Sequence, residues 1–154
     1  MKPVTLITDG ACIGNPGPGG WACILRHNQA KKEIYGSEPR TTNNRMELTA
    51  VIKGLRAIKE RCRVTVITDS EYVKHGITQW IHRWKQKGWI TSTKTPVLNK
   101  ELWISLEAEA GRHEVHWQWV KGHADHPDNI RADELATMAA RDQSTRPPRN
   151  AERF

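Results

Sequence analysis

Two acidic residues follow two nearly identical short segments of the sequence. Residues 4–9 read VTLITD and residues 64–69 read VTVITD. Both runs are apolar and β-branched, which predicts two buried strands. A carboxylate at the end of a buried strand is costly unless it is paired or holds a cation. Asp9 and Asp69 are therefore candidate ligands of a metal site.

Two further acids lie beside the apolar faces of predicted helices. Glu47 lies in the first turn of a helix expected over about 44–61, and Asp133 lies in a helix expected over 128–141. Taken singly, each could be an ordinary helix residue, and Glu47 could simply complement the helix dipole. Four clustered carboxylates, however, raise one another's pKa and need cations to stay ionised. An all-oxygen ligand set suits Mg²⁺ or Mn²⁺, and two such ions about 3.5–4 Å apart promote displacement at phosphorus.

These acids need a scaffold that brings distant segments together, and the apolar patterns predict an α/β fold. Short links between strands expected at 4–8, 21–27 and 33–36 indicate an antiparallel meander. The helix over 44–61 then leads to a strand at 64–68, which makes that strand parallel to one already in the sheet. The other elements are expected as a strand at 115–120 and helices at 71–75, 79–87, 100–110 and 128–141. Sites in such sheets form at the carboxyl ends of parallel strands, where Asp9 and Asp69 would lie.

The composition fits one basic domain. The chain has 154 residues, with 24 Lys and Arg against 17 Asp and Glu, which gives a net charge of +7. No acid occurs in residues 72–99, where five Lys and Arg residues fall. That stretch is either a solvated basic face or, as we favour, a footprint for a phosphate backbone. We expect a folded domain over 1–142 and a disordered basic tail over 143–154, because the chain turns polar there and contains Pro147-Pro148.

Cysteine use and hydropathy bear on the compartment. The three cysteines have no CxxC spacing, which favours a reducing environment over a disulfide framework or a zinc site. No segment has the roughly 18 apolar residues of a membrane span, and none resembles a signal peptide. We therefore expect a cytoplasmic monomer that needs no membrane and no obligatory protein partner.

Six short motifs are spread over most of the chain. They are TDG at 8–10, GNPG at 14–17, TTNNRMEL at 41–48, TDS at 68–70, WVKGH at 119–123, and Asn129 followed by ADELA at 132–136. In this order they resemble the bacterial type 1 ribonuclease H (ribonuclease HI) family, over residues 1–142. The resemblance implies a mixed five-stranded sheet with helices on both faces. It also implies an endonuclease that cuts the RNA strand of an RNA–DNA hybrid with Mg²⁺, leaving 5′-phosphate and 3′-hydroxyl ends.

The resemblance assigns catalytic roles to six positions. The four metal-binding carboxylates fall on Asp9, Glu47, Asp69 and Asp133, which would hold two Mg²⁺ ions, with Mn²⁺ able to substitute. His123 would move a proton or help product release, and Asn129 would orient a ligand or water beside Asp133.

The resemblance also implies how a hybrid would be bound. The positions expected to face the RNA strand are Gly10, Cys12, Asn15, Asn43 and Asn44. Those expected to contact the DNA strand are Thr42, Arg45, Asn99 and Trp80. Trp84 has core spacing with its neighbours and is interpreted as packing, and Trp103, Trp117 and Trp119 are assigned to the core.

Two residues depart from the common family wording. Glu71 stands where an amide is usual, and an acid there is expected to repel phosphate slightly. Asp125 stands where glycine is common; we expect it to stiffen its loop and to raise the pKa of His123.

Other functions remain as alternatives. Proofreading exonucleases of the same broad fold need an acid two residues after the first Asp, where this chain has Ala11. Transposase-like relatives remain possible but lack the TTNNRMEL wording. A catalytically dead hybrid-binding module predicts a missing carboxylate, whereas all four are present. A generic basic structural protein would not explain acids at the ends of strands.

Overall fold

A computed structural model describes residues 1–121 and 126–146, and it contains a mixed five-stranded sheet. The strands are β1 (Lys2–Cys12), β2 (Gly17–His27), β3 (Ala30–Thr41), β4 (Cys62–Thr68) and β5 (Glu114–Trp119). Their order in the sheet is β3-β2-β1-β4-β5. The first three strands are antiparallel, and β4 is parallel to both β1 and β5. The predicted α/β architecture is confirmed.

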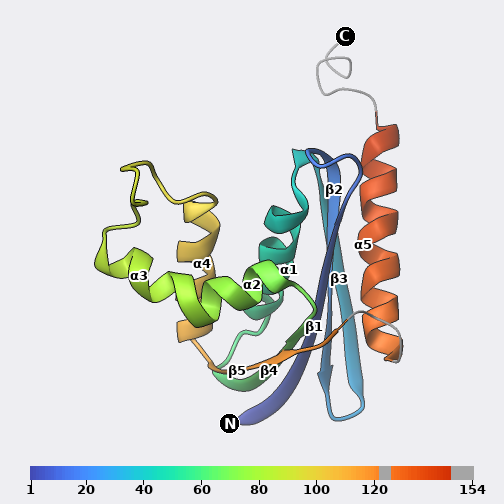
Figure 1. Ribbon diagram of the computed structural model, residues 1–154. Coiled ribbons are helices and arrows are strands. Elements are labelled where there is room, and N and C mark those ends of the chain that lie inside the picture. The colour runs from blue at the N-terminus through green and yellow to red at the C-terminus, as the bar shows by residue number, and fades with distance from the viewer. Residues whose placement is uncertain (122–125, 147–154) are drawn as a thin grey trace.

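Helices cover both faces of this sheet (Figure 1). They are α1 (Asn43–Ala57), α2 (Glu71–His75), the π-helical turn η1 (Gly76–Trp80), α3 (Ile81–Gln86), α4 (Lys100–Gly111) and α5 (Pro127–Thr145). Helix α5 packs on one face, and α1 and α4 lie on the other. Among the helices of the described residues, none is long and apolar enough to cross a membrane.

The two similar segments pair with each other in register. In the β1–β4 ladder Val4 lies opposite Val64, and Ile7 lies opposite Ile67. Alternate residues face opposite layers: Leu6 joins the large core under α1, whereas Ile7 and Ile67 join a smaller cluster with Ala132 of α5. Each strand therefore delivers its acid at an equivalent position, as the repeated sequence predicted.

The strands are longer than expected because packing overrides local turn signals. The second strand was expected at 21–27, yet β2 begins four residues earlier, at Gly17. A Cβ at Gly19 would lie 2.3 Å from the Thr41 side chain, and one at Gly20 would lie 2.2 Å from the Ala136 carbonyl oxygen. These glycines let β3 and α5 approach the strand closely, which a local reading of the sequence cannot detect.

Two helix boundaries also differ from the predictions. Helix α1 ends at Ala57, four residues earlier than expected, because the chain must reach β4 at Cys62. Helix α5 continues to Thr145, and Ser37 Oγ donates a 2.8 Å hydrogen bond to Gln143 Oε1. The expectation that the tail begins at residue 143 is therefore wrong, and residues 147–154 lie outside the described part of the chain.

Candidate active site

Three carboxylates from three separate elements converge at the ends of the parallel strands. Asp9 lies near the end of β1, Asp69 directly follows β4, and Glu47 lies on α1. One oxygen of each lies within 4.8 Å of the others. Asp9 is 3% exposed and Glu47 is 6% exposed, whereas Asp69 is half-buried. The group defined by these three residues is called the carboxylate cluster below.

Gly10 allows this convergence. A Cβ at Gly10 would lie 2.7 Å from the Glu47 amide nitrogen and 2.8 Å from the Met46 carbonyl carbon. Because glycine has no side chain, the backbone of α1 rests directly on β1 and brings Glu47 to Asp9. The Gly10 amide also donates a 2.9 Å hydrogen bond to Asp9 Oδ1.

The position of Glu47 within α1 differs from the expectation. The helix begins at Asn43, capped by Thr42, and its first turn contains no acid. Glu47 is therefore past the first turn, which argues against a simple partner of the helix dipole. Its place in the carboxylate cluster is the better explanation for a buried acid.

Electrostatics in the cluster favour a bound cation. Burial, followed by the negative charges of Asp9 and Asp69, raises the pKa of Glu47 well above its usual value. Within the described residues, the buried Glu47 Oε2 has no hydrogen-bond partner. A buried carboxylate oxygen without a partner is costly. The residues present thus fit a hard cation such as Mg²⁺, which takes oxygen ligands.

The fourth expected ligand, Asp133, lies on α5 and outside the group of three. It is half-buried. Its neighbour Ala132 packs against Ile7 and Ile67, each two residues before an acid of the cluster. One helical turn before Asp133, the side chain of Asn129 is buried, and no other described residue forms a hydrogen bond with its Oδ1. Asn129 and Asp133 are therefore polar neighbours, along α5, of the alanine that packs beside the two strands carrying Asp9 and Asp69.

The loop before α5 carries two of the predicted residues. His123 and Asp125 lie outside the described residues, so their assigned roles stay predictions. His126, which follows them, caps α5: its Nδ1 accepts a 3.2 Å hydrogen bond from the Asp128 amide.

The residues expected to face the RNA strand gather where β1 ends and α1 begins. Asn15 Oδ1 accepts a 2.9 Å hydrogen bond from the Asn43 amide, which ties the first loop to the helix. The Cys12 thiol lies 3.4 Å from the Thr41 carbonyl oxygen. Burial raises the pKa of this thiol, which keeps it protonated as a weak donor. Asn44 is half-buried nearby on α1.

The expected DNA-phosphate residues form one hydrogen-bonded group. Thr42 Oγ1 accepts a 3.3 Å bond from the Arg45 amide. Arg45 Nη1 donates to Asn99 Oδ1 at 3.1 Å and to Glu101 Oε1 at 2.7 Å. Asn99 Nδ2 in turn donates to the Tyr72 hydroxyl at 3.1 Å. The grouping was predicted, but the parts played by Tyr72 and Glu101 were not.

The tryptophans divide between core and surface. Trp103 is fully buried, and its Nε1 donates to the Tyr72 hydroxyl at 3.0 Å. Trp84 packs against Trp103, with ring centroids 5.5 Å apart, which fits its interpretation as packing. Trp80 is half-buried beside Tyr72. Trp117 and Trp119 stack on each other and are only half-buried, so they cover the edge of the core.

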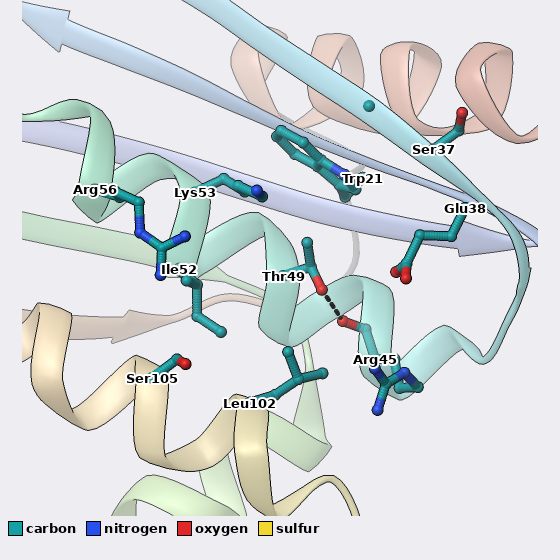
Figure 2. A pocket seen from close by; sticks show the side chains of 11 residues that line it. Trp21, Ser37, Glu38, Arg45, Thr49, Ile52, Lys53, Arg56, Leu102 and Ser105 are labelled. Carbon is teal, nitrogen blue, oxygen red and sulfur yellow. Dashed lines mark hydrogen bonds between the residues drawn. The ribbon is translucent and has the colours of Figure 1, made fainter.

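A hollow of about 420 Å³ lies on the outer side of α1, and its lining includes none of the cluster acids. Figure 2 shows Trp21 on one side of α1 and Leu102 and Ser105 of α4 on the other. Arg45 and Arg56 line it, but each is paired with an acid of α4, Glu101 or Glu109. Its charge is therefore largely balanced, and the carboxylate cluster remains the candidate centre for chemistry.

Two ion pairs that hold α5 on the sheet were not predicted. Arg26 of β2 forms a two-bond pair with Asp128, and Arg131 donates to Glu33 of β3 at 2.8 and 3.2 Å. An acid in the first turn of a helix, as Asp128 is, usually indicates only dipole stabilisation. Nothing in the sequence signals its partner 102 residues away.

Comparisons with known proteins agree with this geometry. Residues 1–141 match the family model described as RNase H. Ribonuclease H of Solibacter usitatus is 63% identical over 144 residues, which cover 94% of this chain and 99% of that protein. Among solved structures, LC9-RNase H1, a type 1 RNase H with the type 2 active-site motif, superposes with a TM-score of 0.83 at 37% identity, covering 92% of this chain and 74% of that one. LC11-RNase H1, solved in complex with an RNA/DNA hybrid, shares the fold with a TM-score of 0.67 at 22% identity, covering 90% of this chain and 97% of that one.

Proposed function

Because the chain belongs to the ribonuclease H family as a bacterial type 1 member, we propose that it is an endonuclease that hydrolyses the RNA strand of RNA–DNA hybrids. The observation that carries the proposal is the carboxylate cluster, in which Asp9, Glu47 and Asp69 converge although they come from three separate elements. The catalytic domain would extend to the end of α5 at Thr145. The products would carry 5′-phosphate and 3′-hydroxyl ends.

The cluster would hold Mg²⁺, and Mn²⁺ would substitute for it. Asp9 would contact two ions, Asp69 and Glu47 would hold the ion on the leaving-group side, and Asp133 would help to hold the ion on the water side. Bound as a pair, such ions would activate the attacking water and stabilise the leaving oxygen. His123 would move a proton or assist product release, and Asn129 would orient a group beside Asp133.

The two strands of the hybrid would be read by different residues. Gly10, Cys12, Asn15, Asn43 and Asn44 would face the RNA strand, where short polar groups can test for the 2′-hydroxyl. Thr42, Arg45 and Asn99 would bind a phosphate of the DNA strand, and Trp80 would contact its sugars. The hydrogen bonds among Thr42, Arg45 and Asn99 support this grouping.

One experiment tests the proposed function against a binding-only role. A labelled RNA–DNA hybrid is compared with duplex RNA, duplex DNA and single-stranded RNA, in Mg²⁺ and in EDTA. We expect cleavage of the RNA strand in the hybrid alone, abolished by EDTA and by Asp69→Asn. Asp142→Asn, an exposed acid elsewhere on α5, is the matched control and should cleave normally.

The products and the variants separate an endonuclease from a protein that only binds the hybrid. Comparison of the product ends with synthetic standards identifies the 5′-phosphate and 3′-hydroxyl. Tight binding of the hybrid without cleavage, in both Mg²⁺ and Mn²⁺, would instead favour a hybrid-binding module. Cleavage that persists in Asp69→Asn would remove the carboxylate cluster from the chemistry.

A further inference from the structure

A two-bond ion pair joins the sheet to the beginning of α5. Arg26 on β2 donates from Nη2 to Asp128 Oδ1 at 2.8 Å and from Nε to Oδ2. The Asp128 side chain is 7% exposed, whereas that of Arg26 is 42% exposed. The pair therefore has a buried acceptor and a solvated donor. Its two parallel hydrogen bonds fix the orientation of the carboxylate relative to the guanidinium as well as the distance between them.

Both the backbone and the side chain of Asp128 are held in place. Pro127 and the His126 cap precede it, and the Asp128 amide donates to the His126 ring. The Arg26 guanidinium holds the pKa of Asp128 below its usual value, so the acid stays charged. A buried charge that loses its partner is strongly unfavourable. The first turn of α5 is therefore held in one place on β2.

The residues that follow Asp128 along α5 include the two that we assign to the metal site. Asn129 is adjacent to Asp128 and buries an Oδ1 for which the described residues offer no donor. Asp133 lies one helical turn after Asn129. Between them, Ala132 packs in the apolar group that contains Ile7 and Ile67, each of which lies two residues before a strand-end acid. The alanine itself is small and apolar, so it gives the helix no directional contact there.

We propose that Arg26 and Asp128 are a positioning pair for the metal site, which holds Asn129 and Asp133 at the place where they can act on a cation bound by the carboxylate cluster. The inference rests on the proposed function. Neither residue touches the reacting atoms: they act through the start of α5. Partners that orient ligands in this way commonly change metal affinity by about 10–100-fold when removed.

A second pair on the same helix provides a matched control. Arg131 donates to both oxygens of Glu33, so its geometry resembles that of the first pair. Both of its side chains are more exposed than Asp128, at 40% and 28%. Since exposed pairs contribute little, Glu33→Gln should leave the metal site as it is.

The test uses the full chain and measures metal binding directly. Mn²⁺ binding without substrate is followed by electron paramagnetic resonance in the wild type, Arg26→Gln, Asp128→Asn, the double variant and Glu33→Gln. We expect the two single variants to bind Mn²⁺ about 10-fold more weakly. The double variant should be no worse than either single variant, because they break the same pair. The Mg²⁺ concentration for half-maximal cleavage should rise by the same factor, with KM for the hybrid unchanged.

Other results would overturn the pair's role. Arg26→Gln with a lower melting temperature but wild-type Mn²⁺ affinity would make the pair a purely structural clamp. If Arg26→Gln fails to fold, Arg26→Lys is measured instead, because lysine keeps the positive charge but cannot form the two parallel bonds. Wild-type Mn²⁺ affinity in Arg26→Lys would refute the proposal. A wild type that neither binds Mn²⁺ nor cleaves would instead refute the proposed function.

Discussion

Gly10 lies so close to Glu47 that a Cβ at position 10 would stand 2.7 Å from the Glu47 amide nitrogen. The nearest obstacles are backbone atoms of α1, which cannot rotate away as a flexible side chain could. The contact therefore sets the distance between the strand that carries Asp9 and the helix that carries Glu47.

Gly10→Ala should separate these two elements. We expect a loss of about 1–3 kcal/mol in the free energy of unfolding, which is the usual cost of overpacking, and a loss of cleavage of at least about 10-fold because the carboxylates are displaced. Urea unfolding and initial rates on a hybrid measure the two effects. Gly111→Ala is the control, since a Cβ at Gly111 meets nothing within 4 Å. Equal behaviour of the two variants would contradict the argument.

Glu47→Gln should stabilise the metal-free protein while abolishing cleavage. Burial, followed by the charges of Asp9 and Asp69, raises the pKa of Glu47, so folding without metal must either bury a charge there or take up a proton, and the neutral amide avoids both costs. Mg²⁺ should raise the melting temperature of the wild type, because a ligand that binds only the folded state stabilises it, and should have little effect on the variant. Calorimetry in EDTA and in Mg²⁺ gives both comparisons. A metal-free variant that melts well below the wild type would show that Glu47 is structural.

The sequence was most informative where local pattern and chemistry coincide. The repeated segments predicted two buried strands, and the helix between them predicted a parallel crossover; Ile7 and Ile67 indeed lie opposite each other in the parallel β1–β4 ladder. Apolar residues at helical spacing in the segment expected as a helix over 128–141 likewise predicted its buried side, which contains Ala132, Leu135, Ala136, Ala139 and Ala140. In both cases the signal lies within one segment, because burial imposes a period on consecutive side chains.

Contacts between distant polar residues were not predictable in this way. Asp128 and Arg26 carry no periodic signal, and either could have been an ordinary surface residue. The start of β2 at Gly17, four residues before the expected strand, was not predictable either, since glycine favours turns unless a neighbour occupies the space of its missing side chain. Such features depend on what lies opposite, which only the folded arrangement reveals.

Glu101→Gln should strengthen binding of the hybrid. Glu101 accepts a 2.7 Å bond from Arg45, the residue assigned to a DNA phosphate, and its side chain is 65% exposed. Incoming phosphate must displace this carboxylate. We expect up to about fivefold tighter binding at low salt, the range for an exposed ion pair. The affinity for a labelled hybrid is measured by fluorescence anisotropy over a range of salt concentrations. Both proteins also carry Asp69→Asn, so that the hybrid is not cleaved.

The control for this change is Glu114→Gln, which removes the same charge from an exposed pair with Arg63 on the far edge of the sheet. It should alter affinity only through net charge. If Glu101→Gln and Glu114→Gln increase affinity for the hybrid by the same factor, the effect comes from net charge. Competition between Glu101 and phosphate for Arg45 would then be excluded.

Asp128→Asn should change how stability depends on pH. Arg26 lowers the pKa of Asp128 in the folded protein, so the pair contributes stability above the unfolded pKa near 4, and that contribution is lost as pH falls through the folded pKa. We expect the variant to be about 1–3 kcal/mol less stable at pH 7, with a difference that narrows below about pH 4. Glu60→Gln breaks a pair with Lys2 in which both side chains are mostly exposed, and its stability should stay close to that of the wild type at every pH. Urea unfolding between pH 7 and pH 3 tests both variants, and a difference for Asp128→Asn that stays constant over this range would show that its charge does not stabilise the start of α5.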